Sequence, residues 1–171
     1  MNVRRQSGFT MVELMVTIAI VGVVAAIAVP RAMHRSGAGV DTFARRLENE
    51  LSELRIRATA TGRWEQIRLD VDGFDVEEAA APGLAEPTEW NLVRRIERSS
   101  EVETIAYDPR TVIAASGAQP SSGTGLPAEI RFSPDGSAQS ATIYIGDAAG
   151  QNLIRLVVMR ATGATYVLDG W

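Results

Sequence analysis

The sequence predicts an α+β fold, with a long N-terminal helix followed only by strands of an antiparallel sheet. Three observations support this prediction. Residues 9–29 form an apolar run of 21 residues with one charge, Glu13. An apolar stripe with helical spacing follows between Val40 and Ala58. Beyond residue 63, short segments rich in apolar residues are separated by glycine-, proline- and aspartate-containing turns. A length of 171 residues accommodates about one domain.

The composition excludes several classes of functional site. There is no cysteine, so disulfides, cysteine-ligated zinc, iron–sulfur clusters and thiol nucleophiles are excluded. The single histidine, His34, excludes histidine-rich metal sites. The net charge of −4 is unevenly distributed: residues 1–40 carry +3 and residues 41–171 carry −7. This balance argues against a general nucleic-acid-binding protein, whose binding depends on clustered cationic charge.

The N-terminal run has the length of a membrane-spanning helix. As an α-helix it would measure about 31 Å, close to the thickness of the hydrocarbon core of a bilayer. It is longer than the apolar region of a secretory signal peptide and ends at Pro30 rather than at a small-residue cleavage site. A plain transmembrane anchor fits the length but leaves Glu13 unexplained, because an acid within a membrane is costly and is usually functional.

The segment Gly8-Phe9-Thr10-Met11-Val12-Glu13-Leu14, after a short basic leader, resembles the class III signal of type IV pilins and pseudopilins. The resemblance implies that a prepilin peptidase cleaves after Gly8 and that Phe9 becomes N-methylated. It also implies that Glu13, the fifth mature residue, acts in subunit docking. Pro30 corresponds to the proline after the membrane half of the helix in this family.

The residues themselves suggest a role for Glu13. Cleavage at Gly8 would free an α-amine on Phe9, about one helical turn before Glu13. A carboxylate buried in an apolar bundle needs a nearby cation, and the amine of the same or a neighbouring subunit would supply one. The alternative is an acid that stays protonated in lipid and has no partner.

The second part of the helix is predicted to begin after a kink or break at Pro30, because proline lacks an N–H and clashes with the preceding turn. Six residues spaced three or four apart form one apolar face, which we expect to pack on a sheet: Val40, Phe43, Leu47, Leu51, Leu54 and Ala58. Gly62 is expected to end this helix.

The strand pattern starts with a predicted hairpin. Asp72-Gly73 is a typical two-residue turn, and it would pair Val71 with Phe74 and Leu69 with Val76. Residues 79–89 and 114–127 are predicted loops, the second a mobile one rich in glycine, serine and proline. Further strands are expected at 91–98, 101–107, 129–132, 141–145, 153–159 and 165–168.

The C-terminal half resembles one branch of the same family, the GspH/FimT domain. The segment Phe132-Ser-Pro-Asp-Gly136 and the later Thr162-Gly163 turn, both among strands, carry this looser resemblance. The branch comprises minor pseudopilins of type II secretion and minor type IV pilins, which implies a pilin-like fold and a place at or near the fibre tip.

Other candidate sites fit simpler interpretations. His34 follows Pro30 at the expected membrane surface, so a catalytic triad there is not expected. The acids from Asp70 to Asp75 lack the glycine and glutamate spacing of a calcium-binding loop. Arg94, Arg95 and Arg98 form the densest basic patch. The resemblance implies that DNA uptake, where minor pilins of this branch perform it, uses an arginine-rich C-terminal tail; residues 161–171 contain no arginine, and this departure disfavours that function. Trp171 is interpreted as either a core cap or a partner contact.

We therefore predict a structural protein, not an enzyme, without cofactor or metal. The resemblance implies a leader at 1–8, a membrane-spanning assembly helix at 9–29, a periplasmic helix half at 30–62 and a β-rich periplasmic domain at 63–171. It implies a minor pseudopilin of a type II secretion pseudopilus, or alternatively a minor type IV pilin. The implied partners are the prepilin peptidase/methyltransferase, other pseudopilins or pilins, the inner-membrane assembly platform and lipid; nucleic acid is not expected.

Overall fold

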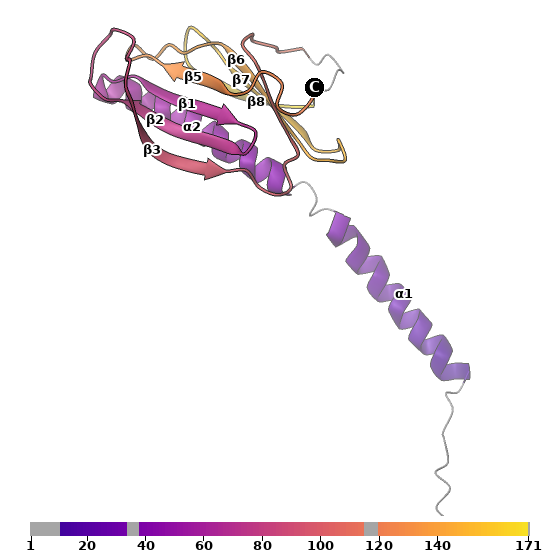
Figure 1. The fold of residues 1–171 in the computed structure, drawn as a ribbon. Helices are drawn as coiled ribbons and strands as arrows, with labels where there is room; N and C mark the ends of the chain where they lie inside the picture. The colour runs from indigo at the N-terminus through magenta and orange to yellow at the C-terminus, as the bar shows by residue number, and fades with distance from the viewer. Residues whose placement is uncertain (1–10, 34–37, 115–119, 171) are drawn as a thin grey trace, which may run out of the picture. The chain divides into compact units, whose positions relative to one another are not determined.

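The computed structural model describes residues 11–33, 38–114 and 120–170, which fall into two compact units, Met1–Ser36 and Gly37–Trp171 (Figure 1). The first unit contains α1 (Met11–Met33). The second contains α2 (Ala38–Thr61) and eight strands. The strands are β1 (Glu65–Asp70), β2 (Gly73–Ala79), β3 (Trp90–Glu97), β4 (Thr104–Asp108), β5 (Ala128–Phe132), β6 (Ala141–Gly146), β7 (Leu153–Val158) and β8 (Thr165–Asp169).

Helix α1 is continuous across Pro30 and ends at Met33, so Pro30 does not break the helix, and the kink expected there stays a prediction. A proline removes one backbone donor, and the turns on either side can remain helical. Among the described residues, no helix combines the length and the hydropathy needed to cross a bilayer.

Helix α2 confirms the predicted amphipathic helix. All six residues of the predicted stripe are buried. Gly62 ends the helix with a φ of +66°, and its N–H donates to the carbonyl of Ala58 at 3.0 Å. Glycine adopts this left-handed conformation without the steric cost that a Cβ would add.

The strands form two four-stranded sheets, and the adjacent strands are all antiparallel. Sheet A has the order β3-β2-β1-β5, and sheet B has the order β4-β6-β7-β8. Each of these strands was predicted from the sequence, but as part of one sheet. Strand periodicity shows which residues share a face, whereas the division into two sheets depends on long-range pairing such as β1 with β5.

One continuous core lies between α2 and the inner faces of both sheets. Phe43 of α2 packs edge-to-face on Phe74 of β2, with ring centroids 5.8 Å apart. Phe132 of β5 and Leu156 of β7 contribute from the two sheets. Burial of this apolar face explains why α2 is stable in spite of its many charged residues.

The β1–β2 hairpin is real, but its predicted register is wrong. Leu69 pairs with Phe74 and Asp70 with Gly73, so the two-residue turn is Val71-Asp72. Gly73 is instead the first residue of β2, with a φ of +142°. A Cβ at Gly73 would collide with the carbonyl oxygen of Ile96 in β3. The close approach of a third strand therefore accounts for this glycine, which sequence spacing alone assigned to the turn.

The outer face of sheet B is covered by residues 109–114. Arg155 of β7 is 3% exposed and holds this segment by donating to two backbone carbonyls, those of Ala114 at 2.8 Å and Ile113 at 3.1 Å. The hydroxyl of Thr142 donates to Arg110 O at 2.7 Å and accepts from Val112 N at 2.9 Å. Buried polar groups on this face are thereby largely satisfied by the covering segment.

Replacement of Arg155 by methionine is expected to loosen the covering segment while the sheet stays folded. The variant loses two charge-assisted hydrogen bonds but keeps most of the apolar volume. Hydrogen exchange of the Val112 amide should then become faster. Arg68→Met, which removes a half-exposed arginine of sheet A, is the matched control and should leave this amide unchanged. Equal exchange in both variants would contradict the holding role of Arg155.

Residues 120–127, the described C-terminal part of the predicted mobile loop, run along the edge of β4. Gly123 N donates to Ile105 O at 2.8 Å, and Tyr107 N donates to Thr124 O at 2.9 Å. This half of the loop thus extends the hydrogen bonding of sheet B.

Candidate assembly helix and polar groove

The predicted processing site, Gly8 and Phe9, lies outside the described residues, as do His34 and Trp171. Glu13 is described, and it lies in the first turn of α1. The hydroxyl of Thr17 donates to the backbone carbonyl of Glu13 at 2.7 Å, so the hydroxyl of Thr17 is satisfied within the helix.

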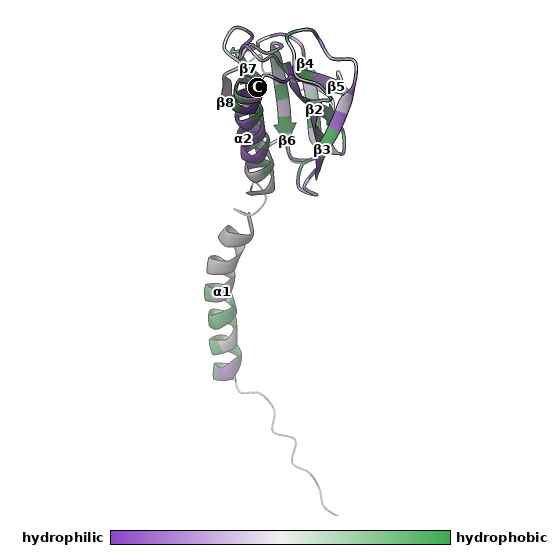
Figure 2. Cartoon of the chain, turned by 90° about the vertical axis from the view of Figure 1, so that its left-hand side faces the viewer, coloured by the Kyte–Doolittle hydropathy of each residue, from purple (hydrophilic) through white to green (hydrophobic). Residues whose placement is uncertain are grey.

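The remaining residues at 11–23 are predominantly apolar (Figure 2). All of them are exposed. A helix that is apolar on all faces must be covered by lipid or by other helices. Nine large apolar side chains form this surface: Met11, Val12, Leu14, Met15, Val16, Ile18, Ile20, Val21 and Val23. Glu13 is the only charged side chain in this stretch. An ion pair with Glu13 would therefore fix the position of a neighbouring helix, whereas the apolar contacts alone are non-specific.

The two glycine turns identified in the C-terminal half come together in space. Gly136 ends the turn after β5, with its N–H donating to Ser133 O at 2.9 Å. Gly163 lies in the β7–β8 turn, and a Cβ on it would approach the carbonyl oxygen of Gly136 to 2.7 Å. Both glycines have positive φ values, +85° and +60°. Two turns distant in sequence therefore pack against each other, with the side chain of Arg55 from α2 beside them.

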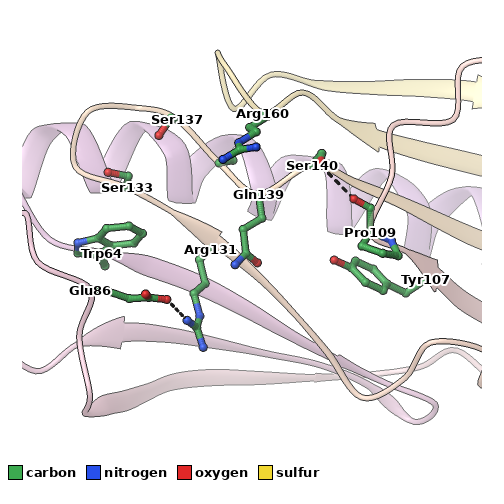
Figure 3. A pocket seen from close by; sticks show the side chains of 11 residues that line it. Trp64, Glu86, Tyr107, Pro109, Arg131, Ser133, Ser137, Gln139, Ser140 and Arg160 are labelled. Carbon is green, nitrogen blue, oxygen red and sulfur yellow. Dashed lines mark hydrogen bonds and ion pairs between the residues drawn. The ribbon is translucent and has the colours of Figure 1, made fainter.

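A polar groove of about 540 Å³ lies beside β5 and the β5–β6 connection (Figure 3). Arg131 of β5 forms an ion pair with Glu86 in the groove, and its guanidinium carbon lies 5.8 Å from the ring centroid of Trp90. The groove is lined by Trp64, Glu86, Tyr107, Pro109, Arg131, Ser133, Ser137, Ala138, Gln139, Ser140 and Arg160.

The serine hydroxyls that line the groove have partners close by in the fold. The hydroxyl of Ser140 donates to the backbone carbonyl of Pro109 at 3.0 Å. Hydrogen bonds from Ser137 and Ser133 hold the pKa of the neighbouring Asp135 carboxyl below its usual range. Within the described ranges, no group of three or more histidine, aspartate or glutamate side chains is placed to hold a metal ion.

Two of the three arginines in the basic patch at 94–98 are paired with carboxylates. Arg94 contacts Glu50 at 2.6 Å, and Arg95 contacts Asp75 at 3.6 Å. Arg98 donates to the backbone carbonyl of Glu103 at 3.2 Å. These contacts lower the net positive potential that would attract a phosphate backbone.

Glu65 at the start of β1 is a fully buried carboxylate, with an exposed fraction of 0%. Neither of its oxygens has a hydrogen-bond partner among the described residues, and the nearest cation, Arg57, is 3.9 Å away. Burial raises the pKa of Glu65 to about 7, against a smaller opposing effect of Arg57. Glu78 and Glu53 raise this pKa further, and Arg63 opposes them.

The N-terminal segment matches a known family. The model described as the prokaryotic N-terminal methylation motif covers residues 3–29, which include Gly8, Phe9 and Glu13. Among solved structures, the chain is similar to the minor pseudopilin EpsH from the type 2 secretion system of Vibrio cholerae. The two share 12% sequence identity with a TM-score of 0.54, over 77% of this chain and 97% of the EpsH chain. Residues 3–29 thus carry the N-terminal methylation motif, and the fold of the chain is similar to that of a minor pseudopilin. No curated protein matches it.

The helices at the N-terminus and the antiparallel sheets after them form a pilin-like fold similar to that of EpsH, which confirms the predicted fold class. The motif helix and the two glycine turns were predictable from the sequence. Glu65 and Arg155 were not, because in the sequence they resemble ordinary charged residues of strands. Glu65, Ile67 and Leu69 are two residues apart in β1 and therefore lie on the same, inner face of the sheet. This spacing was the signal in the sequence that could have predicted the burial of Glu65.

Proposed function

We propose that this chain is a minor pseudopilin, a structural subunit that takes part in assembly at the tip of a type II secretion pseudopilus. The observation that carries the proposal is the combination of the methylation motif at 3–29 with a globular unit whose fold is similar to that of EpsH. The exposed apolar surface of α1 supports it, because that surface needs neighbouring helices or lipid.

In this proposal, residues 1–8 are a leader that the prepilin peptidase removes, and Phe9 becomes the methylated N-terminus. Residues 9–29 anchor the subunit in the bacterial inner membrane and later enter the fibre core. Residues 30–62 and 63–171 lie in the periplasm. Other pseudopilins and the inner-membrane assembly platform are the partners. The function is structural.

Intact mass of the chain from membranes tests the proposal directly. In cells with an active prepilin peptidase, the mass should correspond to loss of residues 1–8 and gain of one methyl group. In cells without the peptidase, the chain should stay uncut. Gly8→Leu serves as a control variant, because it removes the small residue before the cleaved bond and should block processing without altering the globular unit. A full-length chain in cells with an active peptidase would overturn the proposal.

A further inference from the structure

The edges of the two sheets differ in how well they are protected. Sheet A has edges β3 and β5, and sheet B has edges β4 and β8. An edge strand presents unpaired N–H and C=O groups that can pair with another chain, and proteins usually protect such edges.

Three of the four edges are protected. The edge of β4 is paired with the segment around Gly123, as described above. The end of β5 is covered by the chain that folds back after it, through Gln139 N to Arg131 O at 3.0 Å. In β3, the register shift places Val93 in a bulge, and the arginines Arg94 and Arg95 follow it. Bulges and charged side chains are common means of blocking edge pairing.

The outer edge of β8 has no such protection within the described part of the chain. Two hydrogen bonds define which of its groups point outward: Gly170 N to Leu153 O at 2.7 Å and Met159 N to Ala164 O at 2.9 Å. Residues with even numbers therefore bond to β7. In an antiparallel ladder the alternate residues point the other way, so Thr165, Val167 and Asp169 direct their N–H and C=O groups to the open edge.

The side chains of β8 favour contact at this edge. Tyr166 is 55% exposed and Val167 is 37% exposed. The strand contains no lysine, arginine or proline, the residues that usually discourage pairing. Its one charge, Asp169, is exposed at the end of the strand. In Figure 2, β8 lies at one side of the globular unit next to α2, while sheet A lies on the other side.

We propose that the open edge of β8 binds an extended segment of a different protein, which adds as a fifth strand to sheet B. Backbone hydrogen bonds to Thr165, Val167 and Asp169 would provide the affinity. Apolar side chains at alternate positions would cover Tyr166 on one face and Val167 on the other. A basic residue opposite Asp169 fits both this carboxylate and the net charge of −7 of residues 41–171.

A second copy of this chain is a poorer occupant. Antiparallel pairing of β8 with itself, centred on Val167, requires a two-fold axis perpendicular to the sheet. Such an axis reverses every direction in the plane of the sheet, including that of α2, which packs on β7 and β8. Two copies would then have antiparallel helices, whereas subunits of one fibre must enter it in the same direction. This choice of occupant rests on the proposed function.

The absence of native cysteine allows a clean cross-linking test with the full chain in cells. We would introduce Val167→Cys and, as a matched control on the protected edge, Leu92→Cys, where the native side chain is 61% exposed. Each would be labelled with a maleimide–diazirine reagent and photoactivated. The expected result is an adduct with a different protein from position 167 and none from position 92.

A backbone variant shows whether the contact is strand addition. Thr165→Pro removes an outward N–H at the first residue of β8, where proline is tolerated, and leaves the bonds to β7 intact. It should weaken the adduct from position 167 about fivefold, as expected for loss of one backbone hydrogen bond. Thr165→Ala keeps the N–H and should have no effect.

Each other outcome overturns the inference. These outcomes are no adduct from position 167, an adduct between two copies of the chain, and an adduct of equal yield in Thr165→Pro and Thr165→Ala. Intact mass measured on the same samples separates this inference from the proposed function. Correct processing without the adduct rejects only the β8 contact, whereas an unprocessed chain rejects the proposed function.

Discussion

Replacement of Glu13 by lysine is expected to abolish incorporation of the chain into the fibre. In the proposed mature protein, Glu13 lies about one helical turn after the α-amine of Phe9 in an otherwise apolar helix. A carboxylate in such surroundings is stabilised by a nearby cation, and the amine of a neighbouring subunit can provide it. Lysine would place two cations together in a low-dielectric bundle, which costs several kcal/mol. The measurement is the fraction of the chain recovered with sheared fibres rather than with membranes.

Two further variants distinguish charge pairing from protonation of Glu13 in lipid. Glu13→Asp keeps a carboxylate and should retain part of the assembly. Glu13→Leu removes the charge and should assemble poorly if pairing matters, but normally if the acid is protonated. Thr17→Val is the matched control, because the Thr17 hydroxyl donates within its own helix. Normal assembly of Glu13→Lys would refute the pairing hypothesis.

Replacement of Glu65 by glutamine is expected to remove most of the pH dependence of stability between pH 4.5 and 7. The pKa of Glu65 is about 7 in the folded chain, against an ordinary value of 4.5, because the carboxyl is buried. Over this interval the folded state binds more protons than the unfolded state, so the free energy of unfolding falls as the pH rises. The stabilising contribution is complete below pH 4.5 and lost above pH 7, and it amounts to about 3 kcal/mol.

Urea unfolding of the full chain in neutral detergent, followed by tryptophan fluorescence, measures this effect. The native chain should lose stability between pH 4.5 and 7, and Glu65→Gln should show a much flatter profile. Glu103→Gln, which neutralises an exposed carboxylate in the same unit, should keep the native profile. Identical profiles for the native chain and Glu65→Gln would show that Arg57, 3.9 Å away, stabilises the charged form more than burial opposes it.

Local spacing was sufficient to predict the elements of this protein. The apolar stripe from Val40 to Ala58 specified α2, because only a helix places residues at these intervals on one face. Alternation and turn residues located the strands to within a few residues; the strand expected at 101–107, for example, begins at Thr104. The motif around Gly8 and Glu13 was recognisable for the same reason, since its residues are contiguous in the chain.

The pairing of strands required the tertiary structure. Gly73 was assigned to the turn, whereas the carbonyl of Ile96, 23 positions later in the chain, is what excludes a side chain there. The division into two sheets, the burial of Glu65 and the hold of Arg155 on the covering segment depend on contacts between residues far apart in sequence. The open edge of β8 belongs to the same group. The edge is open because β8 is the last strand of sheet B, with β7 as its neighbour in the sheet. The residues of β8 alone do not predict this position.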